Sequence, residues 1–385
     1  MQTILKPDTR QKIVLLDDLT CFDQEGEPAL TPRQQRQRAY LANSVSELQR
    51  PDGPIRVLKT LQTSACERNC YYCPFRAGRS STARVTFSPD ELAGEFDRMR
   101  RAGVVQGLFL SSGIIGGGVK TMDKTLATVE LLRRKYEYRG YIHLKLMPGA
   151  EEAQIEQAMR LADRVSINLE GANTDRLSVL APQKDMRAEL LAAMQSVREI
   201  AHRLPPLVRT PSLATQFVVG PAGESDRELL TGVDWLYRRV GLARAYYSAF
   251  HPVSDTPLAG CPATPALREH RLYQADWLLR FYGFTLAELP FDAGGSLPVD
   301  ADPKLAWARA HLAEQPIEVN RAGRAELLRI PGVGPQGAEA ILRARRQSPL
   351  RQLADLRALG VIANRAAPFI LLHGQRPPYQ LQLAL

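Results

Sequence analysis

The chain has 385 residues, of which 44% are hydrophobic, and a formal net charge of +9 that is carried mainly by arginine. Because one domain usually holds about 100–200 residues, we expect two or three domains. No apolar run approaches the roughly 20 residues that a membrane span needs, and the first residues lack a signal-peptide pattern. We therefore expect a cytoplasmic protein with no membrane partner. Its positive charge favours a polyanionic partner.

Residues 1–55 mix charges, prolines and short apolar runs, and we interpret them as an N-terminal extension without chemistry of its own. A helix is expected from Pro32 to Leu48. Cys21 is isolated in this stretch, and an isolated thiol is usually a small buried side chain.

Three closely spaced cysteines follow the first predicted strand. Residues 57–63 contain no glycine or proline and are rich in β-formers, so they predict a strand that leads directly to Cys66, Cys70 and Cys73. Three thiolates on one short loop can bind three irons of a cubane cluster and leave the fourth iron open to a small molecule. A zinc site completed by Cys21, Cys261 or a histidine is the alternative. Disulfides are disfavoured, because five cysteines is an odd number and no secretory signal is evident.

Strands and helices then alternate. Ser88 as N-cap, Pro89 in the first turn and Glu91 three residues after the cap predict a helix to about Arg101. Further strands are expected at 105–110, 141–146, 165–169, 213–219 and 243–250, and further helices at 122–136, 151–161, 187–203, 225–240 and 265–282. Alternation of this kind gives a parallel sheet with right-handed crossovers. We predict an α/β fold with a partial (β/α)6 TIM-like barrel over residues 56–290, with its reactive groups at the C-terminal ends of the strands.

Polar residues occur where such strands end. The second strand leads to Ser111, Ser112 and Gly113, and a glycine run at 116–118 is interpreted as a flexible turn or a phosphate cradle. Along the next strands, alternation places these polar side chains on one face, which indicates a wet barrel interior: His143, Lys145, Ser166, Asn168, Glu170, Gln216, Tyr246 and Ser248. Gln183 and Lys184 lie in a loop that we expect to meet substrate. Catalytic candidates are Lys145, Gln183, Lys184, Gln216 and Tyr246. The alternative is that each is a supporting or surface residue.

A small C-terminal module is predicted after a linker at 291–315 that is rich in proline, glycine and aspartate at its start. Residues 316–385 resemble an all-α helix-hairpin-helix domain with the hairpin Pro331, Gly332, Val333 and Gly334. The glycines let backbone amides approach a phosphate at the start of the next helix. The stretch from Arg321 to Arg346 contains six arginines and only two glutamates, which gives it an excess of positive charge. We assign Arg343 and Arg346, together with the hairpin, to nucleic-acid binding. Residues 350–361 predict a second, degenerate hairpin. Such modules can instead bind proteins or pack on their own chain.

The cysteine loop resembles that of the radical SAM superfamily. The resemblance implies a [4Fe-4S] cluster on Cys66, Cys70 and Cys73, and S-adenosylmethionine on the open iron. It also implies a 5′-deoxyadenosyl radical that takes hydrogen from substrate. Tyr72 matches the aromatic residue that lies near the adenine. The cofactor-binding residues that it implies are Tyr72, Ser111, Ser112, Gly113, Lys145, Ser166, Asn168 and Glu170. The glutamate that commonly ends the glycine-rich turn of the family is missing after Gly113.

Residues 109–113, 140–145 and 181–184, together with the hairpin, resemble one group more closely: radical SAM proteins assigned to DNA modification or repair that carry a C-terminal helix-hairpin-helix. This resemblance implies a nucleic acid, DNA above all, as partner, and an electron donor such as flavodoxin or ferredoxin. Two other hypotheses stay open. The substrate could be a peptide or small molecule, or the protein could be a non-catalytic iron–sulfur protein that binds nucleic acid.

Overall fold

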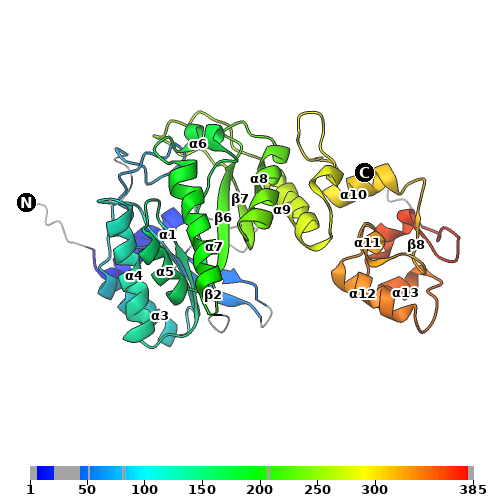
Figure 1. Ribbon diagram of the computed structural model, residues 1–385, viewed down its shortest axis with the longest axis horizontal. Coiled ribbons are helices and arrows are strands. Elements are labelled where there is room, and N and C mark those ends of the chain that lie inside the picture. Colours follow the sequence, from blue (N-terminus) through cyan, green and yellow to red (C-terminus); the bar gives the residue numbers. More distant parts are fainter. Residues whose placement is uncertain are drawn as a thin grey trace, which may run out of the picture. The chain divides into compact units, whose positions relative to one another are not determined.

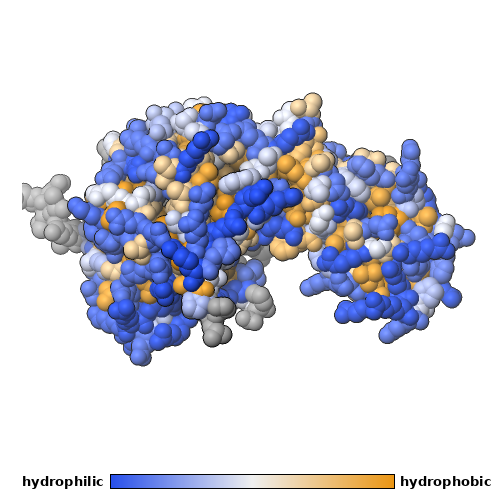
Figure 2. Space-filling model, in the orientation of Figure 1, coloured by the Kyte–Doolittle hydropathy of each residue, from blue (hydrophilic) through white to orange (hydrophobic). Residues whose placement is uncertain are grey.

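The computed structural model describes residues 7–20, 44–50, 53–79, 82, 84–205 and 209–379. The chain divides into two compact units. The first unit comprises Met1–Glu224 and Trp235–Thr264, and the second comprises Ser225–Asp234 and Pro265–Leu385. No helix in the described ranges is long and apolar enough to cross a membrane, and the face drawn in Figure 2 is largely hydrophilic.

The first unit is built on a seven-stranded sheet in the order β1-β2-β3-β4-β5-β6-β7, curled into a half-barrel. The strands are β1 (Val45–Leu48), β2 (Ile55–Leu61), β3 (Gly107–Ser111), β4 (Tyr141–Lys145), β5 (Arg164–Ser166), β6 (Ser212–Val219) and β7 (Arg244–Ala249). Neighbours from β2 to β7 are all parallel. This confirms the predicted parallel α/β half-barrel, since each predicted strand of the barrel overlaps an observed one.

Helices connect these strands. They are α1 (Thr9–Thr20), α3 (Pro89–Arg101), α4 (Gly118–Arg134), α5 (Glu152–Leu161), α6 (Thr174–Leu180), α7 (Ala192–Arg203) and α8 (Asp226–Arg239). Helices α3, α4, α5 and α7 pack side by side in that order (Figure 1). Because helices cover the sheet, β3 is buried along its whole length, as parallel strands usually are.

The start of α3 forms as predicted. The Ser88 Oγ accepts the backbone N–H of Glu91 at 3.2 Å, and the Glu91 carboxylate accepts that of Ser88 at 2.7 Å. This reciprocal capping box satisfies two N–H groups that the helix itself leaves open. It also fixes the point at which the chain leaves residues 85–87, which bind the backbone of the cysteine segment through Phe87 N–H to Gln62 O at 3.0 Å.

Two secondary-structure expectations are corrected. A helix was predicted from Pro32 to Leu48. Its residues up to position 43 lie outside the described part of the chain, and for residues 45–48 the prediction is wrong. Those residues form β1, which pairs antiparallel with β2, so pairing with a sheet edge overrides local helix propensity. The helix expected at 187–203 begins with a π-helical turn, Met186–Leu191, before α7, and α6 was not predicted.

The second unit contains α9 (Ala266–Phe281), the short helix η2 (Leu286–Glu288), α10 (Pro303–His311), α11 (Arg324–Leu327), α12 (Pro335–Ala344), α13 (Leu353–Ala358), α14 (Ala363–Ala366) and η3 (Ala367–Phe369). Two short strands, β8 (Ile317–Glu318) and β9 (Ile370–Leu371), pair in parallel. The expectation of an all-α C-terminal part is therefore corrected by this small sheet. Helix α10 also lies within the stretch predicted as a linker.

Candidate functional site

The cysteine loop leaves the C-terminal end of β2, and its thiols are free. Cys66, Cys70 and Cys73 form no disulfide, and Cys70 is 9% exposed. The backbone N–H of Ile114 points at the Sγ of Cys66, and that of Phe75 at the Sγ of Cys73, each at 3.4 Å. Donors aimed at sulfur are the kind of contact that tunes cysteine-ligated clusters. Burial raises the pKa of the Cys70 and Cys73 thiols in the free protein.

The loop after β3 holds one side of the cysteine loop. Gly113 donates its N–H to Thr63 O at 2.7 Å, and a Cβ at Gly113 would lie only 2.3 Å from Ala65 O. Glycine is thus required at 113 by close backbone approach. Glu67 accepts the N–H groups of Gly116 at 2.8 Å and Gly117 at 3.0 Å. The glycine run is neither a loose turn nor an open phosphate cradle, because the carboxylate of Glu67 already occupies these two amides.

Residues 180–189 hold the other side. Tyr71 donates its N–H to Leu180 O at 2.7 Å, and Asn69 donates to the side-chain oxygen of Gln183 at 3.1 Å. Arg68 donates to Gln183 O at 2.6 Å and pairs with Glu189 at 2.9 Å. Gln183, a catalytic candidate from the sequence, is placed here as a residue that positions the loop.

A buried ion pair lies next to the cysteines. Lys184 Nζ is 2.7 Å from the carboxylate of Glu170, and the two side chains are 10% and 4% exposed. Burial is the largest single effect and lowers the pKa of Lys184, but the charge and hydrogen bond of Glu170 and the charges of Cys70 and Cys73 together outweigh it, so the net pKa is raised. Burial raises the pKa of Tyr72 well above its usual value, and a hydrogen bond with Glu170 adds to this. Glu170 has φ 63°, a left-handed conformation that is uncommon for a non-glycine residue.

The polar face predicted along the strands is present. Ser166 Oγ is 2.8 Å from the Nε2 of His143, whose ring stacks on Phe109 at 4.4 Å. Asn168 donates to Gln216 at 3.2 Å. Burial lowers the pKa of His143 well below its usual value, so this imidazole is neutral near pH 7. Neighbouring strands thus present two hydrogen-bonded pairs of neutral groups, His143 with Ser166 and Asn168 with Gln216.

Three further predicted residues are placed at different points. Lys145 ends β4, with its Nζ 5.7 Å from the centre of the Phe109 ring. Ser112 Oγ donates to Gly113 O at 2.6 Å, which stiffens the turn. The hydroxyl of Tyr246 bonds Arg164 at 2.7 Å, at the beginning of β5. Arg164 is the first residue of β5, so this contact lies toward the N-terminal ends of the parallel strands, whereas the cysteine loop lies at their C-terminal ends.

The fit of the cysteines to a cluster can be tested against a single-ion site. Across the described ranges, no three His, Cys, Asp or Glu side chains stand close enough to hold one metal ion. A tetrahedral zinc site needs its sulfurs at about 2.3 Å from one ion. A cubane spreads its cysteine ligands over separate irons, which suits three free thiols spaced along one loop with N–H donors to two of them. The donor set therefore fits a cluster.

The predicted hairpin in the second unit is a tight turn packed on its own chain. Gly332 has φ +83°, and a Cβ there would lie 2.4 Å from Ile362 O. Gly334 is the N-cap of α12, with φ −96°, and its nearest neighbour would be Tyr282 Oη at 3.4 Å. The buried Lys304 donates to Val333 O at 2.5 Å and lies 4.5 Å from the Tyr282 ring centre. After α13, Ile362 donates its N–H to Gly332 O at 3.0 Å, which joins the second turn to the first.

The arginines of this module divide into two groups. Arg329 and Arg345 donate to backbone carbonyls within the second unit, and Arg324 pairs with Glu339. The side chains of Arg321, Arg343 and Arg346 are exposed. The surface charge that this module offers to a partner is therefore smaller than the six arginines suggest.

Comparison with known proteins places the first unit. Residues 61–236 match the model of the Radical SAM superfamily, a stretch that begins at the end of β2 and includes the cysteine loop. This stretch of the chain is therefore similar to the radical SAM superfamily. The superfamily uses a [4Fe-4S] cluster and S-adenosylmethionine. No curated protein matches the sequence.

Solved structures give matches of low identity. The FeFe-hydrogenase maturase HydG from Carboxydothermus hydrogenoformans is 17% identical with a TM-score of 0.44, over 58% of this chain and 50% of that one. Methylornithine synthase (PylB) is 15% identical with a TM-score of 0.47, over 58% of this chain and 61% of that one. The chain thus spans between half and two thirds of the length of these proteins.

The placement of the cysteines generates a first prediction. Cys70→Ser should abolish the visible absorbance of the reconstituted cluster and the cleavage of S-adenosylmethionine, because a serine oxygen replaces a central thiolate on the loop. Anaerobic iron and sulfide analysis with a cofactor-cleavage assay measures both.

Cys261→Ser is the matched control, since Cys261 is a free thiol outside this loop. We expect it to keep cluster and activity, as we do for Cys21→Ser, whose position lies outside the described residues. Zinc with little iron in the anaerobic wild-type protein would overturn the assignment.

Lys304 generates a second prediction. Burial lowers its pKa from 10.5 to about 7. Between these values the unfolded chain binds a proton that the folded chain does not, so stability should rise with pH, by up to about 1.4 kcal/mol per pH unit. Lys304→Met, which keeps the length and removes the charge, should lose this increase. Denaturant unfolding at pH 7 and 9 measures it, and equal pH dependence of the two proteins would contradict the buried, neutral amine.

Proposed function

We propose that this protein is a radical SAM enzyme that acts on a nucleic acid, with DNA as the first candidate, and modifies or repairs one nucleotide. When bound, the cluster and S-adenosylmethionine would supply a 5′-deoxyadenosyl radical for hydrogen abstraction, with the electron coming from a donor such as flavodoxin or ferredoxin. The observation that carries the proposal is the glycine turn at the start of α12, with exposed arginines on the same helix and just beyond it.

Within the first unit, the chain's own residues would bind and orient. Cys66, Cys70 and Cys73 would hold the cluster, and the Glu170–Lys184 pair keeps the adjoining segment fixed beside them. Tyr72 contacts this pair from the cysteine loop. Asn168 and Gln216 form a neutral, hydrogen-bonding row on which ribose hydroxyls or a base edge would find partners.

The hairpin supports a phosphate contact on physical grounds. The first amides of α12, a ten-residue helix, have no partner within the helix, and the helix dipole favours an anion there. Arg343 and Arg346 add exposed guanidinium groups, which pair with phosphate in a bidentate way. Contacts of this type hold a nucleic-acid backbone without reading its sequence.

An aromatic pair in the same unit supports a single-stranded substrate. Trp277 and Phe281 lie one turn apart on α9, with ring centres 4.8 Å apart and exposures of 47% and 44%. The Arg280 guanidinium lies 4.7 Å from the Phe281 ring centre. The Arg280 charge is paired with Asp276 at 2.6 Å, so the rings themselves form the surface on which unpaired bases would stack, at about 1–3 kcal/mol per base. The residue after Phe281 is Tyr282, which approaches the hairpin at Gly334.

Point substitutions in the hairpin test the phosphate contact. Gly334→Ala adds a Cβ at an ordinary contact distance, so it should preserve folding while obstructing close approach of a phosphate. Arg343→Gln with Arg346→Gln should weaken oligonucleotide binding and lower the slope of log affinity against log salt by about 1–2. Fluorescence anisotropy at several salt concentrations measures this.

The control is Arg309→Gln, an exposed arginine of the same unit that pairs with Asp300. Gly332→Ala is a poorer probe, because its Cβ would collide with Ile362 O and disturb the fold itself. If Gly334→Ala and the Arg343→Gln, Arg346→Gln double variant both bind the oligonucleotide as tightly as the wild type does, the hairpin is not the site that holds the nucleic acid.

The proposal also predicts which nucleic acid reacts. Flipping a paired base costs a few kcal/mol, and least where pairing is already lost. The enzyme should therefore form 5′-deoxyadenosine faster with single-stranded or mismatched oligonucleotides than with matched duplex. Deuterium from a labelled nucleotide should enter that product, as detected by mass spectrometry. No rate change with any oligonucleotide and no label transfer would instead point to a peptide or small-molecule substrate.

A further inference from the structure

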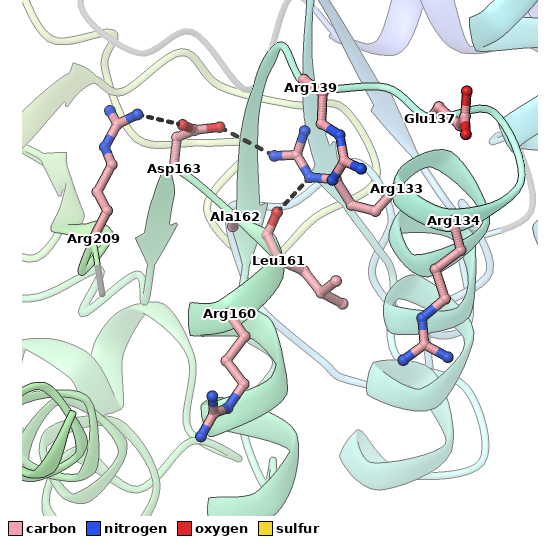
Figure 3. Close-up of a pocket in the computed structure, with 9 residues that line it drawn as sticks. All are labelled: Arg133, Arg134, Glu137, Arg139, Arg160, Leu161, Ala162, Asp163 and Arg209. Carbon is pink, nitrogen blue, oxygen red and sulfur yellow. Dashed lines mark hydrogen bonds and ion pairs between the residues drawn. The ribbon is translucent and has the colours of Figure 1, made fainter. Parts of the chain in front are cut away.

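A basic pocket lies in the first unit, at the N-terminal ends of the parallel strands, whereas the cysteine loop lies at their C-terminal ends. It has a volume of about 600 Å³. Its lining comes from the end of α4, the turn before β4, the end of α5, and the segments that precede β5 and β6 (Figure 3): Arg133, Arg134, Glu137, Arg139, Arg160, Leu161, Ala162, Asp163 and Arg209. These segments approach the N-terminal ends of their strands, whereas the cysteine loop leaves the C-terminal end of β2. The pocket is therefore separate from the radical SAM site.

Asp163 holds two guanidinium groups at once. One carboxylate oxygen is 3.1 Å from Arg209, and the other accepts from Arg133 at 3.2 Å and from the N–H of Ile142 at 2.9 Å. Arg133 also donates to the carbonyls of Leu161 and Gly140 at 2.9 and 2.8 Å. Its position is thus fixed by the fold. One carboxylate cannot neutralise both arginines, so the pair keeps an excess positive charge.

The other arginines raise this charge further. Arg139 is exposed, and within the described part of the chain its side chain makes no ion pair. Figure 3 draws it beside Arg133. Burial lowers the pKa of Arg133, and the charge of Arg139 contributes to the same effect. Repulsion between these two cations is a cost that an anion placed near both would remove.

Arg134 and Arg160 could bind an anion at a small cost in free energy, because the ion pairs that they would give up are exposed. They pair with Glu130 and Glu156 on their own helices, and the arginine side chains are 80% and 56% exposed. Exposed pairs of this kind contribute about 0–1 kcal/mol, so an entering anion can compete for them. The lining itself carries five arginines against one aspartate and one glutamate.

We propose that this pocket binds an anion that carries phosphoryl groups. Guanidinium groups line it from several elements, and a guanidinium presents paired N–H donors that match phosphate oxygens. The volume falls within the range of small-molecule sites, about 300–1,000 Å³. The phosphoryl groups belong either to a free oligophosphate or to the backbone of a nucleic acid.

Calorimetric titration of the full-length protein at low salt tests the proposal. The probes are inorganic tripolyphosphate and a single-stranded oligonucleotide with a 5′-phosphate. The variant is Arg139→Gln with Arg209→Gln, in which Asp163 keeps its contacts with Arg133 and Ile142. For the probe that binds in the pocket, we expect the Kd of the variant to be at least tenfold higher than that of the wild type. Arg101→Gln is the control, an exposed arginine of the same unit that pairs with Asp97 on α3.

The outcomes distinguish the two sources. If the variant weakens only tripolyphosphate binding, the ligand is a free oligophosphate. Loss of affinity for the oligonucleotide assigns the pocket to a nucleic-acid backbone. If neither probe binds the wild type, or if the variant and the control bind both probes equally well, the proposal is overturned. Circular dichroism of each variant confirms that folding is retained.

Discussion

The cysteine loop depends on backbone contacts from its neighbours, because it has no regular secondary structure to satisfy its own polar groups. Its amides and carbonyls are bound by the turn after β3, by residues 85–87 and by residues 180–189. Close approach at Gly113, whose Cβ would lie 2.3 Å from Ala65 O, sets the spacing on one side. Buried backbone groups must find partners. The thiols of the loop are therefore positioned by three segments that are far apart in the sequence.

The buried pair of Glu170 and Lys184 lies beside the cysteines and adds to this arrangement. A buried ion pair is costly to desolvate and seldom adds net stability, but loss of one partner leaves an uncompensated charge. In this chain the pair also contacts Tyr72 and lies beside Cys70 and Cys73. Its most direct physical effect is to fix one geometry of the segments that surround the thiols.

Much of the first unit was predictable, because strand and helix periods alternate cleanly from β2 to β7. The three cysteines and the capping box at Ser88 are local signals, and local signals can be read along one segment. The contacts of Gln183 and Lys184 were not predictable in the same way. Gln183 binds a loop more than a hundred residues earlier in the chain, and Lys184 binds a carboxylate on another loop. Residues that look like substrate ligands in a polar loop can equally be supports, and only the fold distinguishes them.

The hairpin shows the same limit. Gly332 and Gly334 look alike in the sequence, yet packing against Ile362 requires the first, while the second has an ordinary φ and room for a methyl group. Arginines that look like a phosphate surface are partly used for internal hydrogen bonds. The basic pocket had no local signal at all, since its arginines come from four separate elements.

The π-helical turn Met186–Leu191 adds one residue per turn to a helix that directly follows Lys184. Such a bulge is equivalent to a single-residue insertion, and it shifts the angular position of everything before it by about 100° relative to an uninterrupted helix. Glu189 lies within the bulge and pairs with Arg68 of the cysteine loop. A homologous chain that lacked the extra residue would have to rotate this helix start or give up that ion pair. The number of residues in this turn therefore distinguishes relatives that can form the ion pair between the helix start and the cysteine loop from relatives that cannot.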